Sequence, residues 1–157
     1  YDGVLWFVNH VLPSILLKNP NMKFYIVGSN PPEDIVNLQS ESIIVTGYVT
    51  DEQLEQYYTK ARIVVVPLRY GAGVKGKVVE AIFNYVPMVT TTIGAEGLND
   101  IDSSVLIADK EEDFAKMVDT LYNDEKMWNE LASNSESYIK SYFSYEAAVA
   151  QIRLDIN

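Results

Sequence analysis

The sequence contains no cysteine and a single histidine, His10, among its 157 residues. The missing cysteines exclude disulfide bonds and metal sites built from thiolates. No apolar run reaches the roughly 18 residues typical of a transmembrane helix, so we expect no membrane insertion by this segment. A net charge of −10 also argues against nucleic acid or an anionic membrane surface as a partner. We expect His10 to be an ordinary surface residue of a helix, because its sequence neighbours offer no partner for acid–base chemistry.

One window lacks acidic residues although the chain as a whole is acidic. No Asp or Glu occurs between Gln56 and Val79. Five basic residues fall in this window, namely Lys60, Arg62, Arg69, Lys75 and Lys77. Gly71, Gly73 and Gly76 follow an apolar run, and we expect them to adopt positive φ and to let the backbone approach a ligand. A helix beginning after such a loop presents free N–H groups and the positive end of its dipole. The window therefore predicts an anion site.

The apolar pattern predicts one α/β domain over residues 1–157. Short continuous apolar runs predict strands at 24–27, 43–45, 63–66, 86–91 and 105–107. Before, between and after the strands, the pattern predicts helices at about 2–18, 33–38, 51–60, around Glu80, and at 111–123, 125–142 and 145–156. Pro13 predicts a kink or weakened turn in the first helix. A loop is expected at 93–98. Continuous apolar strands separated by helices favour a Rossmann-like, doubly wound parallel sheet covered on both faces, with C-terminal helices.

Loops with glycine follow four of the predicted strands. They contain Gly28, Gly47, residues 70–76 and residues 92–97. Open doubly wound sheets bind ligands at the carboxyl ends of their strands. We therefore expect these loops to line one rim and to form a binding site there.

An ordered set of motifs carries a family resemblance. The motifs are Ile26-Val27-Gly28, Gly47-Tyr48-Val49-x-Asp51, Tyr57-Tyr58-x-x-Ala61, Pro67-Leu68-x-Tyr70-Gly71-Ala72-Gly73-Val74-Lys75-Gly76-Lys77-x-x-Glu80-Ala81, Val86-Pro87-x-Val89-x-Thr91 and Gly94-x-Glu96-Gly97. The set resembles the carboxyl-terminal, donor-binding domain of group 1 glycosyltransferases, which is one half of the GT-B fold. The resemblance implies transfer of a sugar from a nucleotide sugar with retention of anomeric configuration, usually without a metal. The nucleotide sugar is then a substrate, and no cofactor is expected.

The resemblance also implies roles for individual residues. Glu80 matches the second glutamate of the family's E-x7-E motif, which accepts hydrogen bonds from the ribose hydroxyls, a task that suits a carboxylate. Lys75 or Lys77 would be catalytic by stabilising the charge on the departing nucleoside diphosphate. The backbone of Gly73, Val74 and Lys75 would face the diphosphate and sugar. The remaining substrate-binding positions are Gly71 and Ala72 in the same loop, Gly47, Tyr48 and Val49 at the base, and Gly28 and Ser29 at an adjacent strand end.

The sequence departs from the family pattern at two positions. Ala72 stands where the first glutamate of E-x7-E is expected, so the usual contact to the donor-sugar hydroxyls is missing or made by another group. Tyr85 replaces a glycine, which puts a helix end with positive φ there in doubt because a bulky residue disfavours that conformation.

We interpret the chain as a fragment that lacks the domain's first strand and the amino-terminal acceptor domain, and we expect it to be inactive alone. Without that central strand, the strands at 24–27 and 63–66 would each lose a neighbour. We expect the gap to close by direct pairing of these strands or by self-association.

Two further functions stay open beside a glycosyltransferase acting on a glycan or lipid-linked acceptor. A non-catalytic module that binds a nucleotide or nucleotide sugar is supported by Ala72. A sugar-nucleotide epimerase or another doubly wound enzyme lacks visible acid–base residues for the sugar. Simpler interpretations are a Lys77–Glu80 surface ion pair, a merely solvated Lys75, and core packing for the aromatic clusters Trp6-Phe7 and 138–145. The expected location is cytoplasmic, with attachment to a membrane surface through the parent protein as an option.

Overall fold

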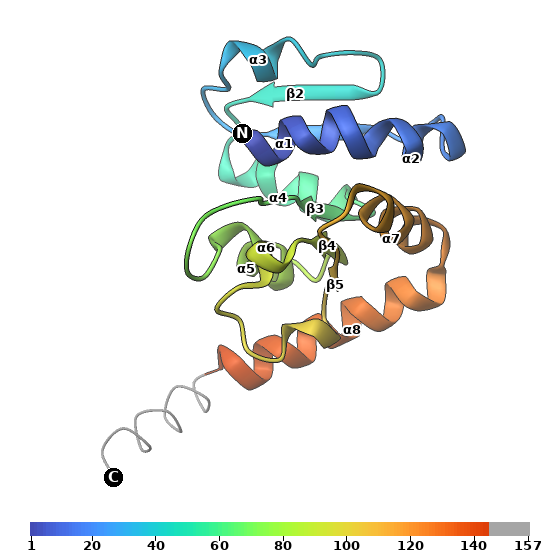
Figure 1. The fold of residues 1–157 in the computed structure, drawn as a ribbon. Coiled ribbons are helices and arrows are strands. Elements are labelled where there is room, and N and C mark those ends of the chain that lie inside the picture. The colour runs from blue at the N-terminus through green and yellow to red at the C-terminus, as the bar shows by residue number, and fades with distance from the viewer. Residues whose placement is uncertain (145–157) are drawn as a thin grey trace.

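Two parallel sheets with helices on both sides make up the computed structural model, which describes residues 1–144 (Figure 1). In the first sheet β1 (Phe24–Val27) pairs with β2 (Ile43–Gly47). In the second sheet β4 (Met88–Thr90) lies between β3 (Val64–Val66) and β5 (Leu106–Ile107). All pairings are parallel, which confirms the predicted α/β fold class.

The helices follow the sequence pattern closely. They are α1 (Asp2–Trp6), the π-helical turn η1 (Phe7–Val11), α2 (Leu12–Lys18), α3 (Glu33–Val36), α4 (Asp51–Lys60), α5 (Gly76–Phe83), α6 (Thr92–Ala95), the 3-10 turn η2 (Ile101–Ser103), α7 (Glu111–Asn123) and α8 (Glu125–Tyr142). The prediction of a loop over 93–98 is wrong in its first half, because α6 forms there with Thr91 as its side-chain cap. The helix predicted at 145–156 lies outside the described residues. No helix in the described part of the chain has the length and apolarity of a membrane-spanning segment.

The first helical segment contains a widened turn just before Pro13. The N–H of Leu12 donates to the carbonyl of Phe7, five residues back, instead of four. Pro13 has no N–H to continue the α-helical ladder, so this turn confirms the weakened turn predicted there. Trp6 and Phe7 are buried and pack edge-on against Phe114 of α7, as expected for core aromatics.

The two sheets are held together by helix packing and not by strand pairing. Within residues 1–144, β1 and β3 each have one hydrogen-bonded neighbour, and they do not pair with each other. The prediction that these strands pair directly is therefore wrong for the chain itself. Figure 1 shows α1 and α2 running along the first sheet above β3 and α7. Phe7 contacts Phe24 of β1, and Val65 of β3 packs against the same core cluster.

The loss of a neighbour also limits burial of the sheets. All residues of β4 are buried, as predicted for a central parallel strand. β1 has no fully buried residue, and Tyr25 on it is 48% exposed. Within the described residues, the sheets are thus buried on both faces, as expected, only around β4.

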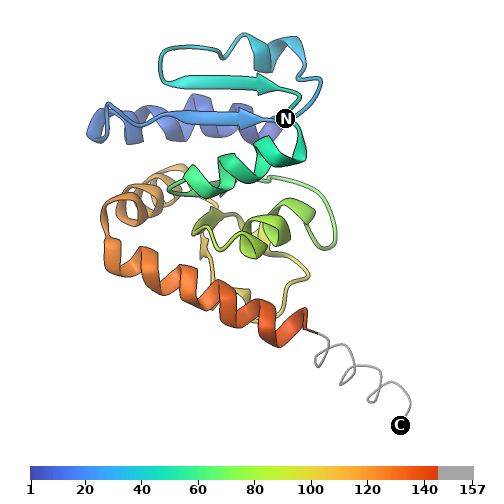
Figure 2. The ribbon, with the colours of Figure 1, turned by 180° about the vertical axis from the view of Figure 1, so that it is seen from behind.

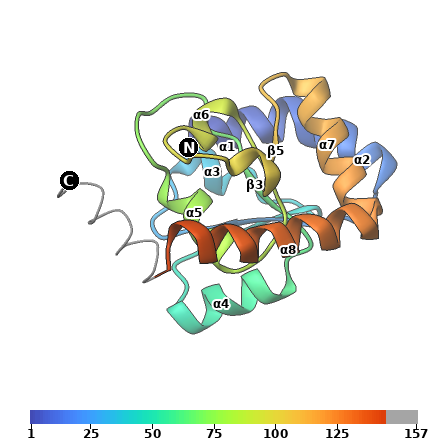
Figure 3. The ribbon, with the colours of Figure 1, turned by 90° about the horizontal axis from the view of Figure 1, so that it is seen from below.

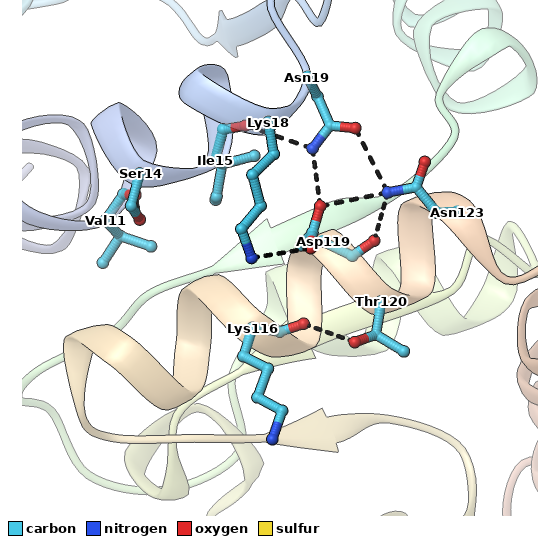
Figure 4. Close-up of polar contacts among 9 residues, drawn as sticks. All are labelled: Val11, Ser14, Ile15, Lys18, Asn19, Lys116, Asp119, Thr120 and Asn123. Atoms are coloured by element: carbon cyan, nitrogen blue, oxygen red, sulfur yellow. Dashed lines mark hydrogen bonds and ion pairs between the residues drawn. The ribbon is translucent and has the colours of Figure 1, made fainter.

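A cluster of polar side chains ties the end of α2 to α7 (Figure 4). Asp119 accepts hydrogen bonds from the amide of Asn19 at 2.8 Å and from the ammonium of Lys18 at 3.2 Å. The amide of Asn123 approaches the same carboxylate at 3.2 Å. The hydrogen bond from Asn19, followed by Lys18, lowers the pKa of Asp119 below its ordinary value. A carboxyl group with a lowered pKa in the folded state stabilises the fold at pH values above its unfolded pKa.

We predict that Asp119→Asn lowers the free energy of unfolding by about 0.5–1 kcal/mol at pH 7, because the ion pair is surface-exposed on its lysine side. The deficit should shrink as the pH falls through the lowered pKa, since the wild-type carboxyl then becomes neutral as well. Urea unfolding at several pH values measures both effects. Glu55→Gln on the exposed face of α4 is the matched control, and an Asp119→Asn deficit that persists unchanged at pH 2 would contradict the assignment.

Tyr85 adopts positive φ, so the expectation that its bulk prevents a helix end of this kind is wrong. Its φ is 56°, directly after the end of α5. The N–H of Tyr85 donates to Ile82 and that of Val86 to Ala81, which is the hydrogen-bond pair of a Schellman helix end. Val86 is buried beyond it. The geometry of the helix end therefore prevails over the side-chain preference, at the cost of local strain.

We predict that Tyr85→Gly unfolds with a free energy about 1 kcal/mol higher than Tyr85→Ala, because only glycine removes the Cβ that disfavours this conformation. Both variants lose the same half-exposed ring, so their comparison isolates the backbone effect. Urea unfolding of the two proteins measures the difference. Equal stability of the glycine and alanine variants would show that the position is unstrained.

Candidate functional site

The loops after β1, β2 and β3 lie on one side of the molecule, together with the start of α1 (Figures 1 and 2). Seen from below, α6 and α7 lie on one side of α8 and α4 lies on the other (Figure 3). Gly3 packs directly on the end of β3, because a Cβ there would lie 1.9 Å from the carbonyl oxygen of Pro67. Arg69, just beyond, reaches back to Asp2 at 3.9 Å and stacks over the ring of Trp6. The predicted rim of strand ends therefore forms.

Three consecutive threonines fix the strand ends to one another. The hydroxyl of Thr90, which is fully buried, donates to the carbonyl of Val66 in β3 at 2.8 Å. The hydroxyl of Thr91 donates to the carbonyl of Leu68 and accepts from the N–H of Gly94 at 3.1 Å. Each hydroxyl thus has a defined partner, and the end of β4 is held against the chain that leaves β3.

Thr92 makes the corresponding link to the end of β5. Its N–H and its hydroxyl both donate to the carboxylate of Asp109, at 2.8 Å and 2.6 Å. Asp109 lies just after β5, so one carboxylate accepts two hydrogen bonds from the start of α6. This bidentate acceptance fixes where α6 begins.

The glycine-containing loop between β3 and α5 has the conformation predicted for two of its three glycines. Gly71 has a φ of 121° and Gly73 a φ of 74°. Gly76 does not have positive φ and is instead the first residue of α5, so that prediction is wrong. No side chain caps α5, whose N-cap is Lys75. The first N–H groups of this helix point into the loop without a side-chain acceptor.

Lys75 is turned into the rim and is not merely solvated. Its ammonium donates to the carbonyl of Gly73 and lies 3.3 Å from the carboxylate of Glu96, which follows α6. The lysine side chain is only 11% exposed, whereas Glu96 is 53% exposed. Lys75 thus connects the loop after β3 to the loop after β4.

Lys77 and Glu80 are not brought to Lys75. Lys77 is exposed, and the structure records no ion pair between it and Glu80, so the predicted surface pair is wrong for the described residues. Glu80 is partly buried and lies close to the phenol of Tyr58 of α4. Burial, followed by the nearby Glu80 carboxylate, raises the pKa of Tyr58 to about 12. Glu80 therefore has a neighbour with which a ligand hydroxyl would have to compete.

The remaining predicted positions divide between the two sheets. Val27 is in register with Gly47, so Gly28 and Ser29 lie beside the loop Gly47, Tyr48 and Val49 at the end of the first sheet. Gly47 has a φ of 67°, and Tyr48 is 75% exposed. Ala72 and Val74 are exposed in the loop of the second sheet. The loops of the first sheet and the loop of the second sheet thus lie on the same side of the molecule.

Several residues of the rim were assigned no role from the sequence. Glu96 and Tyr58 occur in the quoted motifs, but their partners Lys75 and Glu80 could not be inferred from spacing. The run of threonines after the apolar strand is a visible signal, because hydroxyls at strand ends commonly bond to backbone groups. His10 forms an exposed pair with Glu111 at 3.5 Å, in agreement with its predicted surface position.

An open hollow of about 550 Å³ lies elsewhere, along the outer edge of β5 between α7 and α8. Its lining includes Leu106, Met117 and Met127, it reaches the rim at Thr92 and Asp109, and it includes none of the residues predicted to bind the donor. The hollow is mostly apolar, and it contains neither the glycine-containing loop nor the start of α5. An anion is therefore expected to bind at the rim and not in the hollow.

The family profile described as "Glycosyl transferases group 1" matches residues 1–124. The chain belongs to this family. Its sequence is 28% identical over 159 residues to an "Uncharacterized 44.6 kDa protein in cps region" of Klebsiella pneumoniae, a match that covers 96% of this chain and 41% of that protein.

Two solved structures have the same fold. One is the C-terminal domain of a glycosyl transferase group 1 family protein from Francisella tularensis, with a TM-score of 0.75, 19% identity and coverage of 91% of this chain and 80% of that one. The other is sucrose-phosphate synthase from Thermosynechococcus elongatus, with a TM-score of 0.71, 20% identity and coverage of 91% and 40%. The chain thus corresponds to a carboxyl-terminal GT-B domain and spans about two fifths of the curated relative's length.

Proposed function

We propose that residues 1–157 form the donor-binding domain of a retaining glycosyltransferase, which transfers a sugar from a nucleoside-diphospho-sugar to a glycan or lipid-linked acceptor. Membership of the group 1 family supports this function. The observation that carries it is the loop from Gly71 to Lys75, which passes through two positive-φ glycines into the uncapped start of α5. Such a loop lets phosphate oxygens approach backbone N–H groups at the positive end of a helix dipole.

The proposed roles follow the positions at the rim. The backbone from Gly71 to Val74 takes the diphosphate, and Lys75 or Lys77 stabilises the charge on the leaving group. Glu80 accepts the ribose hydroxyls, for which the nearby phenol of Tyr58 would compete. The loops at Gly28-Ser29 and at residues 47–49 take the base from the first sheet. The parent enzyme then acts in the cytoplasm, free or attached to the membrane surface.

The acceptor enters through a second domain in this proposal, and residues 1–157 alone bind donor without turning it over. A cleft enzyme needs both walls to position its two substrates. Self-association through the free edges of β1 and β3 is a further proposal, supported by the unpaired backbone groups on these strands. A binding module without catalysis remains the second candidate, and the observation that favours it is Ala72 in place of a glutamate.

We predict that Glu80→Ala weakens binding of the matching nucleoside diphosphate by about 10–100-fold, because a charged hydrogen-bond partner is removed. Calorimetric titration with UDP, GDP and ADP measures the change. Tyr58→Phe is the matched control, since it removes only the phenol that competes for Glu80 and should not weaken binding. An equal loss with the 2′,3′-dideoxy nucleotide, or no loss at all, would show that Glu80 does not hold the ribose.

A further inference from the structure

We propose that Glu96 is a specificity-determining residue that accepts hydrogen bonds from the sugar hydroxyls of the donor. This inference rests on the proposed function and names a side chain for the sugar of the donor, to which only the glycine-containing loop has been assigned. Ala72 offers no side-chain acceptor in the glycine-containing loop. Glu96 comes from the neighbouring loop, after β4, and reaches the same place through Lys75.

The carboxylate of Glu96 is held by one oxygen and open at the other. Oε2 lies 3.3 Å from the ammonium of Lys75. Oε1 has no hydrogen bond or ion pair with the described residues, and the side chain is 53% exposed. Lys75 itself is nearly buried at 11% exposure. The nearly buried ammonium of Lys75 thus orients the exposed carboxylate of Glu96, and the lone pairs of Oε1 stay available to a ligand.

The backbone around Glu96 is packed against the glycine-containing loop. A Cβ on Gly94 would lie 2.0 Å from the hydroxyl of Thr90, so this part of α6 sits directly on the end of β4. Gly97 has a φ of 79°, and a Cβ there would lie 3.1 Å from Val74 and 3.6 Å from the carbonyl carbon of Gly73. The position of Glu96 relative to the loop is therefore set by close backbone packing on both sides.

The arrangement of charges fits a phosphate ester of a sugar better than a bare phosphate. Lys75 and the uncapped start of α5 attract a phosphate group, whereas Glu96 repels one. A carboxylate accepts hydrogen bonds and donates none, so it prefers hydroxyl groups. A nucleoside-diphospho-sugar carries sugar hydroxyls next to its second phosphate, so it offers this site both a phosphate group and hydroxyl groups.

The test compares each nucleotide sugar with its own nucleoside diphosphate. UDP-glucose, UDP-galactose, GDP-mannose and ADP-glucose are titrated calorimetrically into the wild-type chain, and the ligand that binds is kept with UDP, GDP or ADP as its partner. We expect Glu96→Gln to weaken the nucleotide sugar about tenfold or more. The nucleoside diphosphate should bind equally well or more tightly, because a repelling charge has been removed.

The nucleoside diphosphate serves as the fold control within the same protein, and Glu130→Gln on α8 is the matched surface control. If Glu96→Gln changes both ligands by the same factor, or neither, Glu96 only pairs with Lys75 and the inference is overturned. If the wild-type chain binds none of these nucleotides or nucleotide sugars, the proposed function itself fails, and the inference fails with it. The two failures are distinguished by whether the wild type binds.

Discussion

The site depends on the hydroxyl and carboxylate contacts that hold the ends of β3, β4 and β5 at fixed positions. Thr90 and Thr91 bond to the chain leaving β3, and Thr92 bonds to Asp109 beyond β5. These contacts determine where α6 begins, and hence where Glu96 meets Lys75. A strand end has unpaired backbone groups, and threonine side chains satisfy them without lengthening the strand. The rim is therefore built from the same residues that terminate the sheet.

The separation of the two sheets has a different physical origin. Helices α1 and α2, with the turn η1 between them, bury one core that reaches both β1 and β3. Helix α4 lies near both sheets as well, because Tyr57 contacts Tyr25 of β1 while Tyr58 packs against the core cluster that contains Val66 of β3. Hydrophobic packing thus joins the sheets where backbone pairing does not. The same packing places the loops after β1 and β2 on the same side of the molecule as the loop after β3.

Much of the fold could be predicted from the sequence because the pattern is local. Helices α7 and α8 begin and end where periodicity indicates, and the capping box of Thr50 and Gln53 starts α4. Two predictions were wrong because hydrogen bonds at helix ends do not show in the apolar pattern. Tyr85 takes positive φ because the helix end and the burial of Val86 impose it, and α6 forms because Thr91 and Asp109 stabilise its first turn.

The candidate site was only partly accessible to sequence reasoning. Gly71, Gly73 and Lys75 could be placed from the glycine pattern and the lack of acidic residues. The contact of Lys75 with Glu96, and of Glu80 with Tyr58, depends on how separate helices pack. The motif that contains Glu96 was visible, but its partner was 21 residues away.

We propose that the rim of strand ends, and no other surface, binds a nucleoside diphosphate. The most direct measurement is a titration of the ¹⁵N-labelled chain with UDP, GDP or ADP, followed by two-dimensional NMR of the backbone amides. We expect the largest shifts in residues 71–77 and 94–97, with smaller shifts at 28–29 and 47–49. Shifts concentrated instead along β5, α7 and α8, at the open hollow, would contradict it.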